Sequence, residues 1–266
     1  MQEDKMIVDV PVYHVEYTET EYGYRPGRGR DNLKKALLKA SHDYCMYCHT
    51  RIRIDGNQYG HLEHAIEKSF LPEKLENCVP NIGIACSTCN DKYKRYGEKN
   101  RKPQQKDLQE FKECANCSST YCNTTCAAYD KLKRAYLKRR ESQFLMQPQG
   151  VTSYDLGIEE KRELSLQYDI LQCKYIPSCE KKYTDYEINF LNHHIAMFGL
   201  NSKQRKTTQL KKFLQDTIEK DGNFSKIEYN SQIVELFVEQ VLKGRNQEEI
   251  LKICRTVYTY QSILFR

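Results

Sequence analysis

The sequence predicts an α+β protein that is mainly helical, with a small metal-stabilised core in its first half and a helical second half. Three observations lead to this prediction. Apolar residues in residues 151–266 recur at steps of three and four, the period of an amphipathic helix. Residues 6–17 are rich in β-branched side chains and favour a short edge strand, and residues 82–86 favour another. Two Cys-x-x-Cys pairs flank the second strand with the spacing of metal-binding knuckles.

The composition is that of a globular protein. The chain has 266 residues, 39% of them hydrophobic and 29% charged, which suffices for one large domain or two modest ones. We expect no membrane span, because no run of about 18 apolar residues occurs. The first residues contain early acids and no apolar segment of a secretory signal, so we expect a cytoplasmic protein. Eight of the 12 cysteines fall into closely spaced pairs, which in such a location favours metal binding over disulfides.

In the first half, a basic loop at residues 25–30 precedes a helix that we expect over residues 32–41, with Asp31 as its N-cap. Residues 97–110 are polar and predict a connector, and residues 129–145 predict a basic helix. The Gln-Pro-Gln-Gly stretch at residues 147–150 is the clearest boundary. The predicted domains are therefore residues 1–149, with a core at about 41–97 and a basic cysteine-containing insert, and residues 150–266.

We expect residues 151–266 to be helical throughout and to serve as an interaction domain. Thr184 is suited to cap one helix and Gly199 to end it. A second helix at residues 202–220 ends at Asp221 and Gly222, and a third at residues 231–243 ends at Gly244. Asn246 then caps the last helix.

Positive charge is concentrated between Lys92 and Arg140. This segment contains 14 Lys and Arg against five Asp and Glu, a net charge of +9 in a chain whose total is +6. Such a local field favours a polyanion, and nucleic acid is the partner that we predict. The alternative is a solvated helix face. The residues expected to contact nucleic acid are Lys68, Lys92, Lys94, Lys138, Arg139 and Arg140.

Two cysteine pairs, Cys45/Cys48 and Cys86/Cys89, are separated by 37 residues. Each Cys-x-x-Cys turn points two thiolates at one ion, and two such turns complete a tetrahedral, structural Zn²⁺ site. Four buried, reduced thiols would be the alternative, but they would not explain the paired spacing.

A second cluster, Cys114, Cys117, Cys122 and Cys126, fits four cysteines into 13 residues. It could hold a second Zn²⁺, replace one knuckle of the first site, or form a redox-active patch.

The segment between the two knuckles carries the residues for a reaction. His64 has an ordinary pKa near 6.5, so its neutral ring can take a proton from water at pH 7. Glu63 and Asn90 offer oxygen ligands to one divalent ion, for which Mg²⁺ is the expected choice. Asn81 is expected to hold the His64 loop by hydrogen bonding to its backbone or to the His64 ring. Together these four residues predict the hydrolysis of a phosphodiester, with Lys68 or Lys94 touching a neighbouring phosphate.

This order of residues resembles the HNH endonucleases. The resemblance rests on Leu-Glu-His-Ala-Ile-Glu-Lys-Ser at residues 62–69, on the Asn of Val-Pro-Asn-Ile-Gly-Ile-Ala-Cys at residues 79–86, and on Cys-Ser-Thr-Cys-Asn at residues 86–90. It covers about residues 41–97 and implies a β-hairpin and a helix around one metal ion, the ββα-metal core. Within that class, the motifs are most similar to the HNH subunits of Septu-type and retron-associated anti-phage defence systems. Tyr93 departs from the pattern where a Lys often follows.

The resemblance implies a nuclease that acts as the effector subunit of a defence complex, with DNA as a more expected substrate than RNA. It also implies an ABC-type ATPase as a partner. Two alternatives stay open: a zinc-stabilised module that binds nucleic acid or protein without catalysis, and a stand-alone restriction or homing-type HNH nuclease. The Glu63–His64 pair separates the first alternative from the enzymes, because a binding module needs neither residue.

Overall fold

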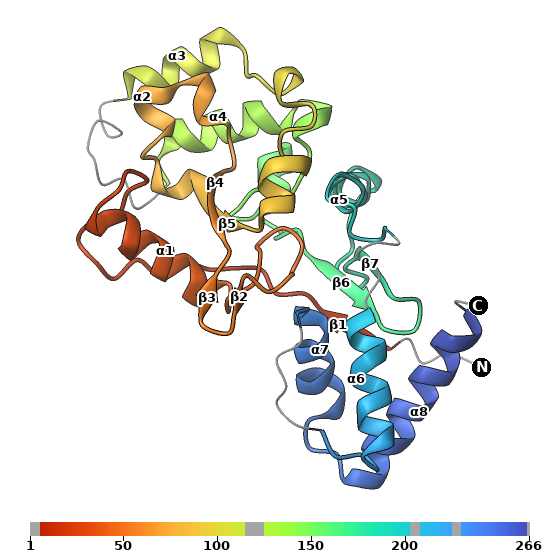
Figure 1. The fold of residues 1–266 in the computed structure, drawn as a ribbon. Helices are drawn as coiled ribbons and strands as arrows, with labels where there is room; N and C mark the ends of the chain where they lie inside the picture. Colours follow the sequence, from red (N-terminus) through yellow and green to blue (C-terminus); the bar gives the residue numbers. More distant parts are fainter. Residues whose placement is uncertain (1–5, 115–124, 203–207, 225–229, 265–266) are drawn as a thin grey trace.

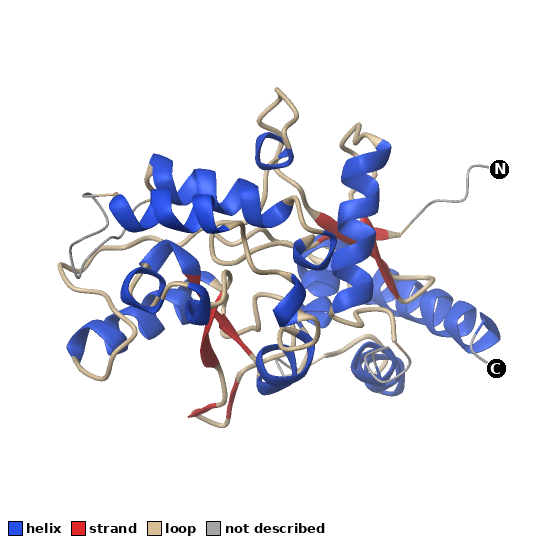
Figure 2. Cartoon of the chain, turned by 90° about the horizontal axis from the view of Figure 1, so that it is seen from above, coloured by secondary structure: helices blue, strands red, loops and turns tan. Residues whose placement is uncertain are grey.

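A computed structural model describes residues 6–114, 125–202, 208–224 and 230–264. It is an α+β structure that combines helices with three small antiparallel sheets, of which the β2–β3 pair lies at the edge of the molecule (Figures 1 and 2). Among the described helices, none combines the length and the apolar character needed to cross a membrane.

The elements of the first half run from β1 (Ile7–Asp9) to α4, in the following order. They are α1 (Arg28–Ala40), β2 (Arg53–Ile54), β3 (Asn57–Gln58), β4 (His61–His64), α2 (Pro72–Leu75), β5 (Ile82–Ala85), a π-helical turn η3 (Thr88–Tyr93), α3 (Gln105–Glu113) and α4 (Ala127–Leu137). The predicted strand at residues 82–86 is therefore present as β5. The predicted connector at residues 97–110 is wrong in part, because α3 occupies its second half.

Helix α1 begins earlier than predicted. Its N-cap is Gly27, and Asp31 lies in its first turn. A close backbone contact lies at its first turn: the amide of Gly23 donates to the carbonyl of Gly29 at 3.1 Å, and a Cβ on Gly29 would lie 3.2 Å from that amide nitrogen. Glycine at position 29 therefore lets the chain at Gly23 pack against the first turn of the helix.

The second half contains β6 (Leu166–Asp169), β7 (Lys174–Pro177), α5 (Asp185–Met197), α6 (Thr208–Glu219), α7 (Gln232–Phe237), a π-helical turn η8 (Val238–Leu242) and α8 (Gln247–Leu264). The prediction of a wholly helical region is therefore wrong. Strands β6 and β7 are four residues each. In so short a segment the spacing of the apolar residues does not show whether the period is that of a strand or that of a helix.

Helix ends in this half agree with the sequence prediction. The Thr184 side chain accepts from the amide of Glu187, and Glu187 reaches back to the amide of Thr184 at 2.7 Å, which completes a capping box. Asn246 and Glu249 cap α8 in the same reciprocal way, at 3.0 and 3.1 Å.

The main sheet has the order β1-β6-β7, so β1 is an edge strand as predicted. Its residues Ile7 to Asp9 pair with Asp169 to Gln167, which joins the two predicted domains through backbone hydrogen bonds. The hydrophobic core is likewise continuous across residue 150. Tyr47 of the first half stacks on Phe198 of the second with ring centroids 4.7 Å apart. The predicted boundary therefore does not separate two cores.

Candidate active site and metal centre

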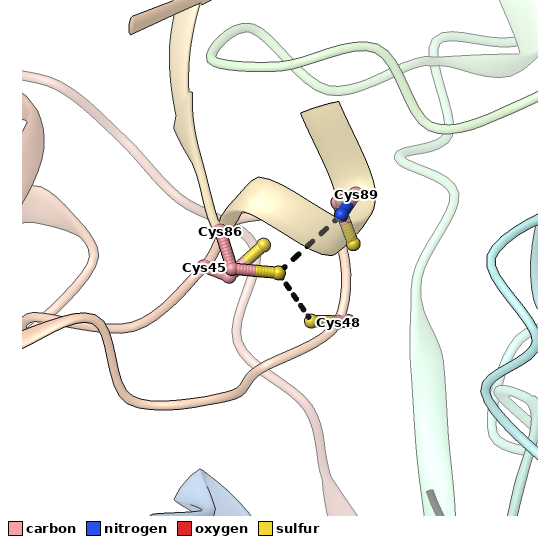
Figure 3. A group of neighbouring side chains, drawn as sticks. All are labelled: Cys45, Cys48, Cys86 and Cys89. Atoms are coloured by element: carbon pink, nitrogen blue, oxygen red, sulfur yellow. Dashed lines mark hydrogen bonds between the residues drawn. The ribbon is translucent and has the colours of Figure 1, made fainter. Parts of the chain in front are cut away.

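The four predicted zinc ligands Cys45, Cys48, Cys86 and Cys89 come together in one cluster (Figure 3). Their sulfur atoms all lie within 4.8 Å of one another, and the Sγ atoms of Cys48 and Cys86 are 3.7 Å apart. A tetrahedral ion with Zn–S bonds of about 2.3 Å requires sulfur atoms about 3.8 Å apart. The cluster can therefore hold a metal ion, and its size fits zinc.

Backbone hydrogen bonds shape the first knuckle and join it to β5. The amide of His49 donates to the carbonyl of Cys45 at 2.9 Å, which closes the knuckle, and the amide of Met46 donates to the carbonyl of Ile84 on β5 at 3.1 Å, just before the second knuckle. Burial raises the pKa of the thiols of Cys45 and Cys89. Because buried thiolates need a counter-charge, a divalent cation is the natural partner of this cluster.

Strands β4 and β5 form an antiparallel hairpin that places His64 at the end of β4, opposite Ile82. The π-helical turn η3, which carries Asn90, follows through the second knuckle, so two strands and a helical turn come in the predicted order. The His64 ring packs on Tyr24 with centroids 4.6 Å apart, and its Nε2 lies 3.0 Å from the carbonyl oxygen of Glu76. Since a carbonyl only accepts, Nε2 carries the proton, and Nδ1 keeps its lone pair.

Burial lowers the pKa of His64 from 6.5 to about 4. The side chain is only 9% exposed, and the neighbouring Lys68 also disfavours its protonated form. The ring is therefore neutral at pH 7 with Nδ1 unprotonated, the state that a general base requires.

This pKa predicts an acid-dependent loss of stability. Below pH 6.5 the unfolded chain protonates His64, whereas the folded chain does so only near pH 4, so the free energy of unfolding falls as the pH drops between these values. The full loss is about 3 kcal/mol for this residue. Urea unfolding of the wild type and of His64→Gln at several pH values measures it, since the variant should show the smaller dependence. His14→Gln, at a side chain 80% exposed, is the control and should behave like the wild type.

Asn81 occupies the position that the sequence predicted for it. It is fully buried, its Oδ1 accepts from the amide of Ile66 at 2.7 Å, and its Nδ2 donates to the carbonyl of Ile66 at 2.8 Å. Its own carbonyl accepts from the amide of Ala65 at 2.8 Å. These three bonds fix the loop immediately after His64, which is the positioning role expected of Asn81.

Glu63 does not share a site with His64. Neighbouring residues of a strand point to opposite faces, and Glu63 faces the interior, where it is 3% exposed. One of its oxygens lies 3.4 Å from the Nζ of Lys94, and the other accepts from the hydroxyl of Tyr47. Both oxygens are thus engaged, and an internal ammonium already supplies the counter-charge. The arrangement does not fit a resident Mg²⁺ on this carboxylate.

Lys94 is the clearest correction among the predicted nucleic-acid contacts. Its side chain is only 4% exposed, and its Nζ donates to the carbonyl of Ala65 at 2.7 Å and pairs with Glu63 and Glu67 at 3.4 Å. Glu67 in turn pairs with Arg101 at 3.0 Å and accepts from Tyr136. Lys94 therefore belongs to a buried charge network and is not available to a phosphate.

The other predicted contacts are accessible. Lys68 is 42% exposed and lies 4.3 Å above the Tyr24 ring beside His64. Lys92 is exposed at the end of η3, and Asn90 is partly exposed with its amide donating to Asp91 at 3.2 Å. Lys138, Arg139 and Arg140 line one cavity of about 470 Å³ between α3 and α4, although Asp107 and Glu141 line it as well.

The segment from Tyr24 to Arg30, which ends in the first turn of α1, is part of the site, and the sequence did not predict this. Tyr24 covers the His64 ring, and Arg25 pairs with the side chain of Glu76 at 2.8 Å, the residue whose carbonyl orients His64. The guanidinium of Arg30 lies 5.3 Å from the centre of the Tyr24 ring. The only signal in the sequence is the run Arg-Pro-Gly-Arg-Gly-Arg at residues 25–30, whose position relative to His64 depends on the tertiary fold.

The second cysteine cluster is described in part. Cys117 and Cys122 lie outside the described residues. Cys114 follows α3 and Cys126 caps α4, with its sulfur accepting from the amide of Tyr129 at 3.4 Å. The second zinc site stays a prediction.

Comparison of the chain with protein-family models, with curated proteins and with solved structures finds no match. The geometry of its own residues is therefore what a function must be argued from.

Proposed function

We propose that this chain is an endonuclease of the HNH class, which hydrolyses phosphodiester bonds in nucleic acid, with DNA as the expected substrate. One observation carries the proposal: the His64 ring is neutral, donates from Nε2 to the carbonyl of Glu76, and leaves Nδ1 free to accept a proton.

In the proposed reaction, Nδ1 of His64 takes a proton from the attacking water as its oxygen bonds to phosphorus, the bond from phosphorus to the leaving sugar oxygen breaks, and a solvent water protonates that oxygen. The hydrogen bond from Nε2 to Glu76 holds the ring in the required tautomer and stabilises the imidazolium as it forms. Asn81 positions the following loop, and Lys68 lies close enough to offset charge on a neighbouring phosphate.

A catalytic divalent ion is part of the HNH resemblance, and the sequence predicted Glu63 and Asn90 as its ligands. The engagement of Glu63 with Lys94 and Tyr47 argues against that pair. We therefore assign the base and the positioning residues and no step to a metal ion. Cleavage is therefore to be measured both with and without added divalent ions.

The resemblance also supports a role as the effector subunit of an anti-phage defence complex that an ABC-type ATPase controls. A zinc-stabilised binding module without catalysis is the second candidate. The exposed cations Lys138, Arg139 and Arg140 favour it as much as they favour a nuclease, because both would need to bind a phosphate backbone.

Replacing His64 with alanine is expected to lower the rate of DNA cleavage by about 10²–10⁴-fold, the usual contribution of a general base. The assay follows single- and double-stranded DNA and RNA, with and without added Mg²⁺ or Mn²⁺. Zinc content and circular dichroism should match the wild type, because His64 is not a zinc ligand. His14→Ala is the matched control and should cleave normally.

If His64→Ala and the wild type cleave DNA at the same rate, His64 is not the general base of the reaction. Absence of cleavage of every substrate by the wild type, with binding retained, would favour the binding module instead.

A further inference from the structure

A second hollow lies along β4 from His64, at the end of the strand that adjoins the second zinc knuckle, since Ser87 and His61 line it. It has a volume of about 400 Å³ and is lined by α1 on one side and by the segment from β3 to the start of β4 on the other. Its chemistry is mixed: Arg30 and Lys34 supply positive charge, Tyr59 an aromatic ring, and Gln58 and Ser87 polar groups. The described residues that line it include no acid, in contrast to the cavity between α3 and α4.

Tyr59 is an exposed ring on a well-fixed backbone. Tyr59 is 57% exposed, and its backbone amide donates to the carbonyl of Ile52 at 2.7 Å. Gly60, directly after it, is closely packed, because a Cβ there would lie 2.7 Å from the ends of the Gln58 and Ile52 side chains. An exposed aromatic ring on a rigid hairpin is suited to stacking and contributes little to the core.

The hollow connects to His64 through residues already in the site. Arg30 lines the hollow and lies against the Tyr24 ring, which packs on His64. Leu62, another lining residue, points to the same face of β4 as His64 and lies two residues, or about 7 Å, from it. The hollow and His64 therefore share strand β4, with the lining residue Leu62 about one nucleotide length from His64 along the strand.

We propose that this hollow binds an unpaired nucleotide next to the scissile phosphate, with its base stacked on Tyr59 and its phosphate between Arg30 and Lys34. The substrate class is then single-stranded or locally unpaired nucleic acid. In a duplex both faces of each base are covered by neighbouring bases, so a duplex cannot offer a base to the ring, whereas every single-stranded base can. A volume of about 400 Å³ is within the range of small-molecule sites.

The inference rests on the proposed function, because it assumes that the bound strand is the substrate of the nuclease. Its test measures binding alone, under conditions in which the strand is not cleaved. Fluorescence anisotropy of labelled oligothymidine, oligouridine and an oligothymidine–oligoadenine duplex is measured without added divalent ions, and gel analysis confirms that each probe stays intact. Tyr59→Ala should weaken binding of the single strands by between about fivefold and a hundredfold, the usual range for one stacked base. Tyr59→Phe should bind like the wild type, because it keeps the ring.

Two further variants complete the test. Arg30→Gln and Lys34→Gln should each reduce the slope of log affinity against log salt by about 0.7, the value for one phosphate contact on a single strand. Tyr260→Ala, at an exposed tyrosine on α8, should leave binding unchanged. Comparison of oligothymidine with oligouridine distinguishes DNA from RNA as the preferred strand.

Equal loss of duplex and single-strand affinity in Tyr59→Ala, or no loss in either, would overturn the proposal. If Tyr59→Ala binds normally while His64→Ala abolishes cleavage, the nuclease stands and this subsite falls. If Tyr59→Ala loses single-strand affinity while the wild type cleaves nothing, the subsite stands and the nuclease falls.

Discussion

Loss of zinc is expected to unfold the first half of the protein. Cys86→Ser removes one of four ligands from a cluster that joins the segment after α1 to the end of β5. Zinc bound to four thiolates contributes roughly 10–16 kcal/mol of folding free energy, whereas domains are stable by about 5–15 kcal/mol in total. The variant should therefore lose one equivalent of zinc and its cooperative thermal transition, as measured by native mass spectrometry and calorimetry.

The control for this experiment is Cys179→Ser, at an exposed cysteine outside the cluster. It should keep the zinc content and the transition of the wild type. A wild-type protein that stays folded with no metal bound would overturn the structural role of zinc. A second equivalent that survives in Cys86→Ser would instead locate a site at the other cysteine cluster.

Lys94→Met is expected to destabilise the protein by about 3–5 kcal/mol, because it removes the cation between two buried carboxylates, Glu63 and Glu67. Burial already raises the pKa of Glu63, and without Lys94 the pKa should rise further. The loss should therefore be larger at pH 8 than at pH 5, where the carboxyl group of Glu63 can more readily take up a proton. Urea unfolding at the two pH values measures both effects.

Lys92→Met, at the exposed lysine two residues earlier, is the matched control and should change stability by no more than about 0.5 kcal/mol. If Lys94→Met has wild-type stability and weaker nucleic-acid binding, the original prediction of a phosphate contact would be restored.

Local spacing accounts for what the sequence predicted correctly. The four zinc ligands follow from two Cys-x-x-Cys turns, and the caps at Thr184 and Asn246 follow from side chains that reach only their own helix. The errors involve tertiary contacts. Strand β6 finds its partner in β1, far away along the chain, and Lys94 is buried although lysine is usually exposed.

The Glu63–His64 pair shows a different kind of error. Treating the two residues as one acid–base unit overlooked the period of a strand, which sends adjacent side chains to opposite faces. The structure assigns His64 to the face with Tyr24 and Glu63 to the interior with Lys94. Recognition of β4 as a strand would have been enough to predict this separation from the sequence.

The pairing of β1 with β6 has a consequence for folding during translation. Ile7 on β1 pairs with Asp169 on β6, so about 160 further residues must be synthesised before the two strands can pair. At roughly 5–20 residues per second this takes on the order of ten seconds or more. The cysteines of both knuckles emerge well within that interval, so the zinc cluster can assemble on the nascent chain while the edge of β1 is still unpaired.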